Sequence, residues 1–338
     1  MTTRPVTRPV PDCVNCTRYR PGQSRGHYES FFQRANHPSR PLAFWIRYTI
    51  FSPHRRPQDA LGELWAVYFD GETEQHVALK RVVPFSACRF ATSDFFVRVA
   101  DAQLQAGKLQ GSIGSAGHML SWDLDYAGEE EPLFLLAPRF YRTRFPSAKS
   151  VVGLPLAVFN GWLRLDGKLI EIADWVGSQN HNWGSRHTDR YAWGQVAGFD
   201  EHPSSFLEVA SARLKLGPLW TPTLTLLVLR HQGNEIRLNS LSQSLRASGS
   251  FSNSLWTFRS VTDELGVEGT LSAARADFVS LTYSNPPGGV KRCLNSKIAS
   301  CALKLTRKRA GRPVASETLF TAHRAAFEIL TDDTRRPE

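Results

Sequence analysis

Short segments with alternating apolar and polar residues recur along most of this sequence, roughly every 8–15 residues from Tyr28 onward. The segment 118–126 shows the alternation clearly, with one apolar and one polar set of side chains. Alternate residues of a β-strand point to opposite faces of its sheet, so such segments are typical of half-buried strands. Residues 84–96 give only a short helical candidate, whereas Asp166-Gly167 is typical of a hairpin turn. The sequence therefore predicts an all-β protein with antiparallel sheets.

The predicted strands are too many for one small barrel. Besides the first, near Tyr28, they lie at 43–51, 63–69, 118–126, 159–165, 168–172, 191–199, 205–214, 223–231, 235–241, 256–261, 266–274, 278–283, 290–305 and 319–330. The 338 residues are enough for two domains, and two barrels in tandem are the simplest arrangement. We expect a disordered basic tail at 1–26, a first barrel at 27–185 and a second at 186–332, with the boundary somewhere in 170–200.

The charge and composition limit the possible partners. The net charge is +10, of which residues 1–26 contribute +4 through five Arg and one Asp. The other basic residues are scattered, apart from a cluster at 307–312, so we expect no nucleic-acid partner, and weak contact with an anionic membrane surface stays open. No apolar run reaches the ~18 residues of a membrane span, and residues 1–26 lack the apolar core of a secretory signal. The expectation is a cytoplasmic protein of undetermined oligomeric state.

The segment 174–195 departs from the strand pattern, because amides, histidines and tryptophans crowd together in it. Gln179, Asn180, His181 and Asn182 follow one another, and each buried polar group without a partner costs about 1–3 kcal/mol. The segment is therefore either a solvated loop or a site on which polar groups converge. Its tryptophans argue against a plain solvated loop.

This segment resembles a known family. Gly177-Ser-Gln-Asn-His-Asn-Trp-Gly184, followed by Tyr191-Ala-Trp-Gly-Gln195, is similar to the central motif of the carotenoid 1,2-hydratase (hydroxyneurosporene synthase), tocopherol cyclase and AttH-like proteins. Trp122-Asp-Leu-Asp-Tyr126 fits the same pattern. The resemblance implies two lipocalin-like (calycin) barrels. It also implies a cofactor-independent hydratase or cyclase that acts on a hydrophobic isoprenoid, polyketide or lipid-like small molecule by acid/base chemistry near the barrel junction.

The chain departs from the family pattern at Asn180, where an acidic residue often precedes the motif histidine. Hydration or cyclisation of an alkene needs a proton donor, and a carboxylic acid with a raised pKa in an apolar pocket is the usual one. An amide cannot serve. Another acid must donate the proton, or the reaction belongs to a different class.

The candidate catalytic residues are His181, Glu208 and Asp174. His181 would act as acid/base or bind a substrate oxygen, or else fix a loop between the barrels together with Asn182. Glu208 shares a strand face with two alanines and a phenylalanine, so its carboxyl would point into an apolar interior and keep its proton near neutral pH. The alternative for Glu208 is a pair with Arg213 or Arg190. Asp174 is a further carboxyl partner, adjacent to the motif.

The candidate substrate-binding residues are Gln179, Asn182, Trp183, His187, Tyr191, Trp193 and Gln195. The last three share one strand face, which suits either a pocket wall or an interface between barrels. Lys297 shares strand parity with Cys293 and Cys301; if this face is interior, Lys297 needs a substrate carboxylate or Glu208 as its partner.

The five cysteines, Cys13 and Cys16 among them, are interpreted as structural or incidental, and no spacing predicts a metal site. Two functions compete with the enzyme. One is a lipocalin-like binding protein for a hydrophobic ligand. The other is a structural protein in which the motif only holds the barrels together.

Overall fold

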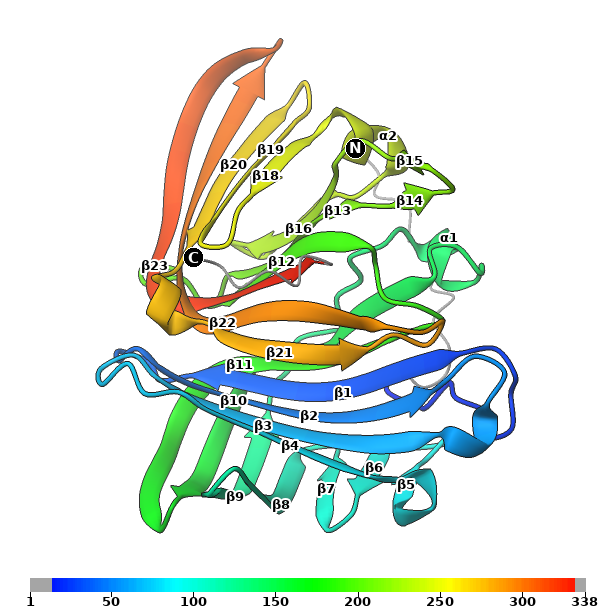
Figure 1. Cartoon of the computed structure of the whole chain (residues 1–338). Helices are drawn as coiled ribbons and strands as arrows, with labels where there is room; N and C mark the ends of the chain where they lie inside the picture. Colours follow the sequence, from blue (N-terminus) through cyan, green and yellow to red (C-terminus); the bar gives the residue numbers. More distant parts are fainter. Residues whose placement is uncertain (1–13, 332–338) are drawn as a thin grey trace.

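The computed structural model describes residues 14–331 and consists almost entirely of antiparallel strands (Figure 1). Eleven strands form sheet A, which is nearly a closed barrel and makes up the lower half of Figure 1. They are β1 (His27–Asn36), β2 (Leu42–Ser52), β3 (Leu61–Asp70), β4 (Val77–Pro84), β5 (Cys88–Phe90), β6 (Phe96–Val99), β7 (Ala102–Gln105), β8 (Lys108–Ser115), β9 (His118–Ala127), β10 (Ala148–Leu165) and β11 (Lys168–Gly184).

Sheet B is a half-barrel of ten strands in the upper half of Figure 1. Its strands are β12 (Arg190–Ala197), β13 (Phe206–Arg213), β16 (Leu224–His231), β17 (Asn234–Leu238), β18 (Ser248–Phe251), β19 (Leu255–Val261), β20 (Leu265–Ser272), β21 (Val279–Ser284), β22 (Val290–Arg309) and β23 (Arg312–Thr331). A separate hairpin pairs β14 (Lys215–Leu216) with β15 (Leu219–Trp220). The predicted two-barrel, all-β fold is therefore confirmed.

Helical structure is short. It comprises α1 (Pro138–Tyr141), α2 (Leu241–Arg246) and three 3₁₀ turns, η1 (Pro57–Asp59), η2 (Phe85–Ala87) and η3 (Arg275–Asp277). The short helical candidate at 84–96 contains only the 3₁₀ turn η2, after which the chain enters β5, whose backbone pairs with β6. Within the described residues no helix is long and apolar enough to cross a membrane.

The three largest clusters of buried apolar side chains in the described residues lie inside sheet A, inside sheet B and between the two sheets. Phe31, with most of the alternate residues of β2, β3 and β9, belongs to the core of sheet A. The third core joins Phe32 and Trp45 of sheet A to Leu281 and Leu330 of sheet B. In Figure 1, β21 and β22 accordingly lie against β1 and β2. The two sheets thus enclose a junction whose walls come from both.

Two predicted features need correction. Residues 14–26 of the predicted tail are ordered, with Tyr19 buried against sheet A, while residues 1–13, with Cys13, lie outside the described residues. Cys293 and Cys301 do not share a face, because β22 has register shifts between Ser296 and Cys301. Cys293 therefore lies in the junction and Cys301 in the core of sheet B.

Candidate functional site

The polar motif is a strand and not a loop. Its residues form the end of β11, which is hydrogen-bonded to β1 on one side and β10 on the other. The alternation of β11 separates the motif into two sets. His181 pairs with Phe31, whose side chain lies in the core of sheet A, whereas Asn180 pairs with Phe32, which lies in the junction. Odd-numbered motif residues therefore face the interior of sheet A, and even-numbered ones face sheet B.

His181 is held on the sheet A side by two hydrogen bonds. Its Nε2 lies 2.8 Å from Oε1 of Glu29, and its Nδ1 lies 2.9 Å from the backbone oxygen of Val14. Burial alone would raise the pKa of Glu29, but hydrogen bonds from His181 and His27 outweigh it and lower this pKa to about 2. Both ring nitrogens of His181 therefore face oxygen acceptors, and Glu29 is its carboxylate partner.

This pair fixes the segment that precedes β1. The Glu29 carboxylate also accepts the backbone N–H groups of Arg18 and Tyr19, at 2.8 to 3.0 Å. The His181 ring stacks on Phe31 at 4.2 Å and is fully buried. Its place in the structure indicates a stabilising role, because both nitrogens are engaged and the ring faces away from sheet B.

A cavity of about 230 Å³ lies at the junction of the two sheets. Its walls combine aromatic and aliphatic side chains with a few polar ones, which is typical of a small-molecule site. The residues that line it include Tyr28, Arg47, Asn182, His187, Tyr191, Trp193, Glu208, Tyr283 and Glu328. No group of three His, Cys, Asp or Glu side chains within residues 14–331 is arranged to bind a metal ion.

Glu208 supplies a buried carboxyl to the cavity wall. It lies on β13 opposite Gln195 of β12. The Trp193 indole Nε1 donates to its Oε1 at 2.7 Å, and the Gln195 amide Nε2 donates to its Oε2 at 2.8 Å. Burial raises the pKa of Glu208 to about 7, although these two hydrogen bonds oppose the rise. Glu208 therefore carries its proton up to about neutral pH. Neither predicted arginine pairs with it, because Arg190 lies over the Phe251 ring and Arg213 donates to the backbone oxygen of Thr221.

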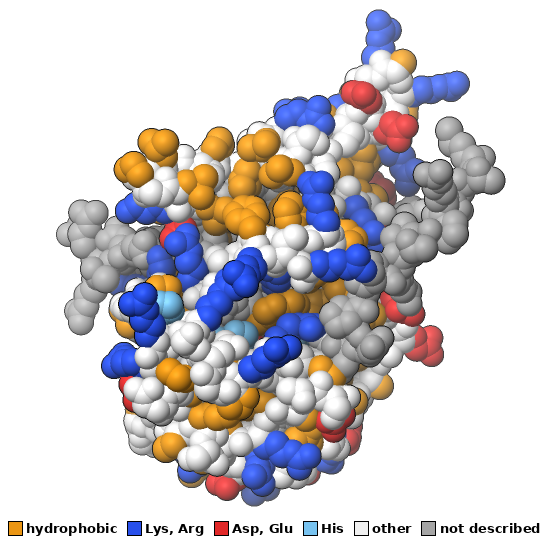
Figure 2. Space-filling model, turned by 90° about the vertical axis from the view of Figure 1, so that its right-hand side faces the viewer, with side chains coloured by type: hydrophobic (Ala, Val, Ile, Leu, Met, Phe, Trp, Pro, Cys, Tyr) orange, Lys and Arg blue, Asp and Glu red, His pale blue; other side chains and the backbone are white. Residues whose placement is uncertain are grey.

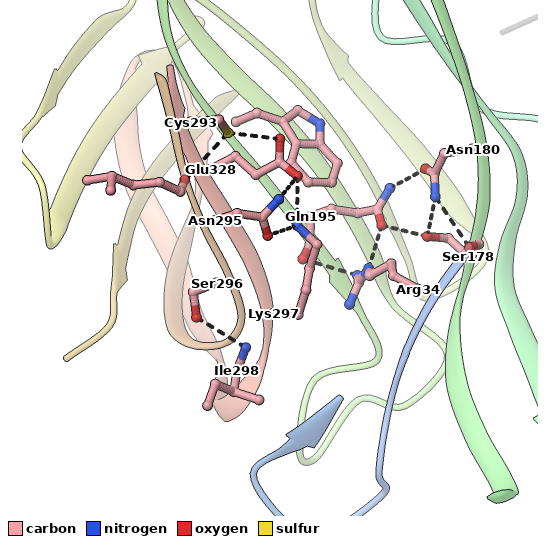
Figure 3. Close-up of polar contacts among 12 residues, drawn as sticks. Arg34, Ser178, Asn180, Gln195, Cys293, Asn295, Ser296, Lys297, Ile298 and Glu328 are labelled. Atoms are coloured by element: carbon pink, nitrogen blue, oxygen red, sulfur yellow. Dashed lines mark hydrogen bonds and ion pairs between the residues drawn. The ribbon is translucent and has the colours of Figure 1, made fainter. Parts of the chain in front are cut away.

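The orientation of Gln195 is set by the strands behind it (Figure 3). Its Oε1 accepts from Arg34 Nε at 2.7 Å and from Ser178 Oγ at 2.6 Å. The amide nitrogen must then point the other way, where it reaches Asn180 Oδ1 at 2.9 Å and Glu208. Ser178 and Asn180 of the β11 motif thus orient the Gln195 amide, which in turn orients the Glu208 carboxyl.

A second carboxyl, Glu328 of β23, forms a separate polar group at the cavity (Figure 3). Lys297 Nζ lies 2.7 Å from its Oε1, and Asn295 Nδ2 donates to the same oxygen at 2.8 Å. Lys297 also lies 5.4 Å from the centre of the Trp193 ring. The buried lysine is therefore partnered by Glu328, and not by Glu208 as one alternative predicted.

The structure brings six of the predicted site residues together. Asn182, His187, Tyr191, Trp193 and Glu208 line the cavity, and Gln195 lies directly behind Glu208. The His187 ring stacks on Tyr28 at 4.0 Å, and burial lowers the pKa of His187 to about 3, so this ring is neutral.

Of the other four predicted residues, His181 borders the cavity, whereas Gln179, Trp183 and Asp174 do not line it. Gln179, His181 and Trp183 are odd-numbered residues of β11, so their side chains face sheet A. Asp174 is exposed, and its carboxyl accepts from Asn160 Nδ2 at 3.3 Å. A solvent-facing carboxyl outside the cavity cannot act on a molecule inside it.

Sequence reasoning missed Arg47, Tyr283 and Glu328. Arg47 and Glu328 are isolated charged residues within apolar strands, in Phe-Trp-Ile-Arg-Tyr and Ala-Ala-Phe-Glu-Ile. The same signal identified Glu208, so it could have found them. Nothing in the sequence around Tyr283 distinguishes it from an ordinary strand tyrosine.

Comparison with known proteins identifies the family. Residues 149–329, more than half of the chain, match the sequence profile of the family described as tocopherol cyclase-like. The chain belongs to the tocopherol cyclase-like family. This match spans the motif strand β11 and all of the cavity residues contributed by sheet B. No curated protein sequence matches the chain.

Three solved structures share the fold of this tocopherol cyclase-like protein. A protein assigned as AttH from Nitrosomonas europaea is 14% identical, with a TM-score of 0.55 and coverage of 92% of this chain and 93% of that one. Kievitone hydratase from Nectria haematococca is 11% identical, with a TM-score of 0.52 and coverage of 91% and 89%. CghA is 10% identical, with a TM-score of 0.51 and coverage of 92% and 90%. At these identities the similarity concerns the fold.

Proposed function

We propose that this protein is a hydratase- or cyclase-type enzyme that acts on a hydrophobic small molecule in the junction cavity, with Glu208 as the proton donor. The observation that carries the proposal is a buried carboxyl with a pKa of about 7 at the wall of a largely apolar cavity. Membership of the tocopherol cyclase-like family supports an enzyme of this general kind.

The proposed chemistry uses the groups around Glu208. The carboxyl transfers its proton to a double bond of the substrate, and a carbocation forms on the adjacent carbon. Tyr191 and Trp193 line the cavity, and their aromatic rings would stabilise this cation. The resulting Glu208 carboxylate is stabilised by the donors Trp193 Nε1 and Gln195 Nε2.

The cation is then consumed by one of two routes. A water molecule adds to it, or a hydroxyl of the substrate attacks it and closes a ring. In both cases the attacking oxygen loses a proton, which returns to Glu208 and restores the acid. No cofactor is needed in this scheme. A protein that only binds a hydrophobic ligand has no need of such an acid, so the buried Glu208 favours the enzyme.

The proposal is tested on the ligand that accompanies the protein. Native mass spectrometry and solvent extraction of the purified protein identify a co-purified small molecule, and its conversion is followed in D₂O. We expect conversion by the wild type with one deuterium gained at carbon, and a rate at least ~100-fold lower for Glu208→Gln.

Asp174→Asn is the matched control, because it removes an exposed carboxyl and should keep the wild-type rate. Wild-type turnover in Glu208→Gln would refute the assignment of the acid. A bound ligand that the wild type leaves unchanged would instead identify a binding protein.

A further inference from the structure

Arg47 is a buried cation at the wall of the same cavity. It lies on β2, between Phe32 of β1 and Trp65 of β3, and both of these neighbours belong to the junction core. Its side chain therefore faces sheet B. Arg47 is 5% exposed and lines the cavity.

The guanidinium of Arg47 is largely without partners. Such a group has five N–H donors. Within residues 14–331, Arg47 donates only one hydrogen bond, from Nη2 to Ser30 Oγ at 2.6 Å, and its Nε is buried with no partner. No carboxylate of these residues lies within ion-pair distance of it.

Arg34, also fully buried without a carboxylate, shows how a structural arginine is satisfied. Its nitrogens donate to Gln195 Oε1, Asn36 Oδ1 and the backbone oxygens of Gln195 and Arg324. Arg47 has no such set. Leaving a buried charged group short of hydrogen bonds is costly, so the missing acceptors of Arg47 call for an explanation.

The surroundings of Arg47 leave its charge available to a ligand. The guanidinium carbon lies 4.5 Å from the centre of the Tyr283 ring and 5.7 Å from that of Trp45, which offsets part of the cost of burial. The two carboxyls that act electrostatically on Arg47 are paired with lysines, Glu63 with Lys80 at 2.8 Å and Glu328 with Lys297 at 2.7 Å. Burial, together with the positive charge of Arg47, lowers the pKa of His187 to about 3, so the His187 ring is neutral.

We propose that Arg47 binds an oxyanion of the substrate, such as a carboxylate, an enolate or a phenolate. This inference rests on the proposed function and deepens it. The substrate would be an amphipathic molecule whose anionic end lies at Arg47, beside Tyr28, His187 and Tyr283, and whose apolar skeleton extends to Glu208. The free N–H donors of Arg47 then make charge-assisted hydrogen bonds with the ligand oxygen atoms.

The test compares three probes with one isoprenoid skeleton, geranate, methyl geranate and geraniol, by isothermal titration calorimetry at pH 8. We expect the wild type to bind geranate at least tenfold more tightly than the two neutral probes. In Arg47→Gln this preference should disappear while the affinity for geraniol stays within threefold. Arg47→Lys should retain part of the preference.

Arg81→Gln is the matched control, because it removes an exposed arginine on β4 and should leave the preference intact. Equal affinity of the wild type for geranate and geraniol, or no binding of either, overturns the inference without any variant. A full preference in Arg47→Gln overturns it as well. Calorimetry measures binding without turnover, so a negative result refutes only the role of Arg47. The proposed function is refuted by a different result, wild-type activity in Glu208→Gln.

Discussion

Glu208→Gln should change how the stability of this protein depends on pH. The pKa of Glu208 is raised to about 7 in the folded protein from an ordinary value of 4.5. Between these two values the folded state binds a proton that the unfolded state has released. Stability linked to Glu208 is therefore fully present below pH 4.5 and is lost as the pH rises through 7.

The magnitude follows from the two pKa values. One pKa unit corresponds to 1.36 kcal/mol, so a difference of 2.5 corresponds to about 3 kcal/mol of unfolding free energy. Most of this change, ~2.5 kcal/mol, falls between pH 5 and pH 8.5. The amide of a glutamine does not titrate, so Glu208→Gln should lack this loss.

The substitution also has a cost that does not depend on pH. Gln195 presents its amide nitrogen to Glu208 Oε2, because Arg34 and Ser178 occupy its oxygen. In Glu208→Gln the new side-chain oxygen still accepts from Trp193, but the new NH₂ group faces the NH₂ group of Gln195. Two donors then face each other without an acceptor, which costs about 1–3 kcal/mol. The expected result is thus a variant that is less stable than the wild type at pH 5 and comes close to it, or exceeds it, at pH 8.5.

The assay is urea unfolding at pH 5 and pH 8.5 for the wild type, Glu208→Gln and Asp174→Asn. The quantity compared is the change in unfolding free energy between the two pH values. It should differ from the wild type by about 2–3 kcal/mol in Glu208→Gln, and not at all in Asp174→Asn. If Glu208→Gln and the wild type show the same change with pH, Glu208 is not a buried acid and the proton-donor argument fails.

Three further predictions concern neighbouring groups. Trp193→Phe removes a donor to the Glu208 anion, so the pH at which turnover declines should rise by about 0.5–1, as read from the pH profile of kcat/KM; an unmoved profile would contradict this. His181→Phe keeps the stacking on Phe31 but removes one hydrogen-bond partner of the buried Glu29 carboxylate. It should lower the unfolding free energy by about 3 kcal/mol. The affinity for geraniol, measured by calorimetry, should stay within threefold of the wild type. The wild type should also lose about 3 kcal/mol as the pH falls from 4.5 towards 2, because the pKa of Glu29 is lowered to about 2; acid unfolding of Glu29→Gln should not show this loss.

The fold could be predicted because strand alternation is a local property of the sequence. Segments such as 118–126 and 191–196 show their two faces directly, and the faces of Tyr191, Trp193 and Gln195 follow from parity alone. Parity fails where the register shifts, and no residue type marks the irregularity of β22. Parity therefore predicts one shared face for Cys293 and Cys301, although the register shifts of β22 put them on different faces.

The site could be predicted only in part, because it is assembled from strands distant in the sequence. Glu208 stood out as a carboxyl on an apolar face, which is a local signal. Lys297 pairs with Glu328 of the adjacent strand. The sequence around Lys297 does not show which strand lies beside it, so this partner could not be predicted. The composition of the motif 177–184 predicts that polar side chains converge. It does not predict that these side chains alternate along β11 between sheet A and sheet B.

The division of β11 explains how the protein can lack an acid at position 180. His181 faces sheet A and holds the segment before β1 through Glu29. Asn180 faces sheet B, where its Nδ2 donates to Ser178 Oγ at 2.8 Å while its Oδ1 accepts from Gln195. A carboxylate at 180 could not make that donation, and it would place a further negative charge in the hydrogen-bond chain that ends at Glu208. An amide at position 180 is therefore compatible with the proposal that the proton donor is Glu208 on β13.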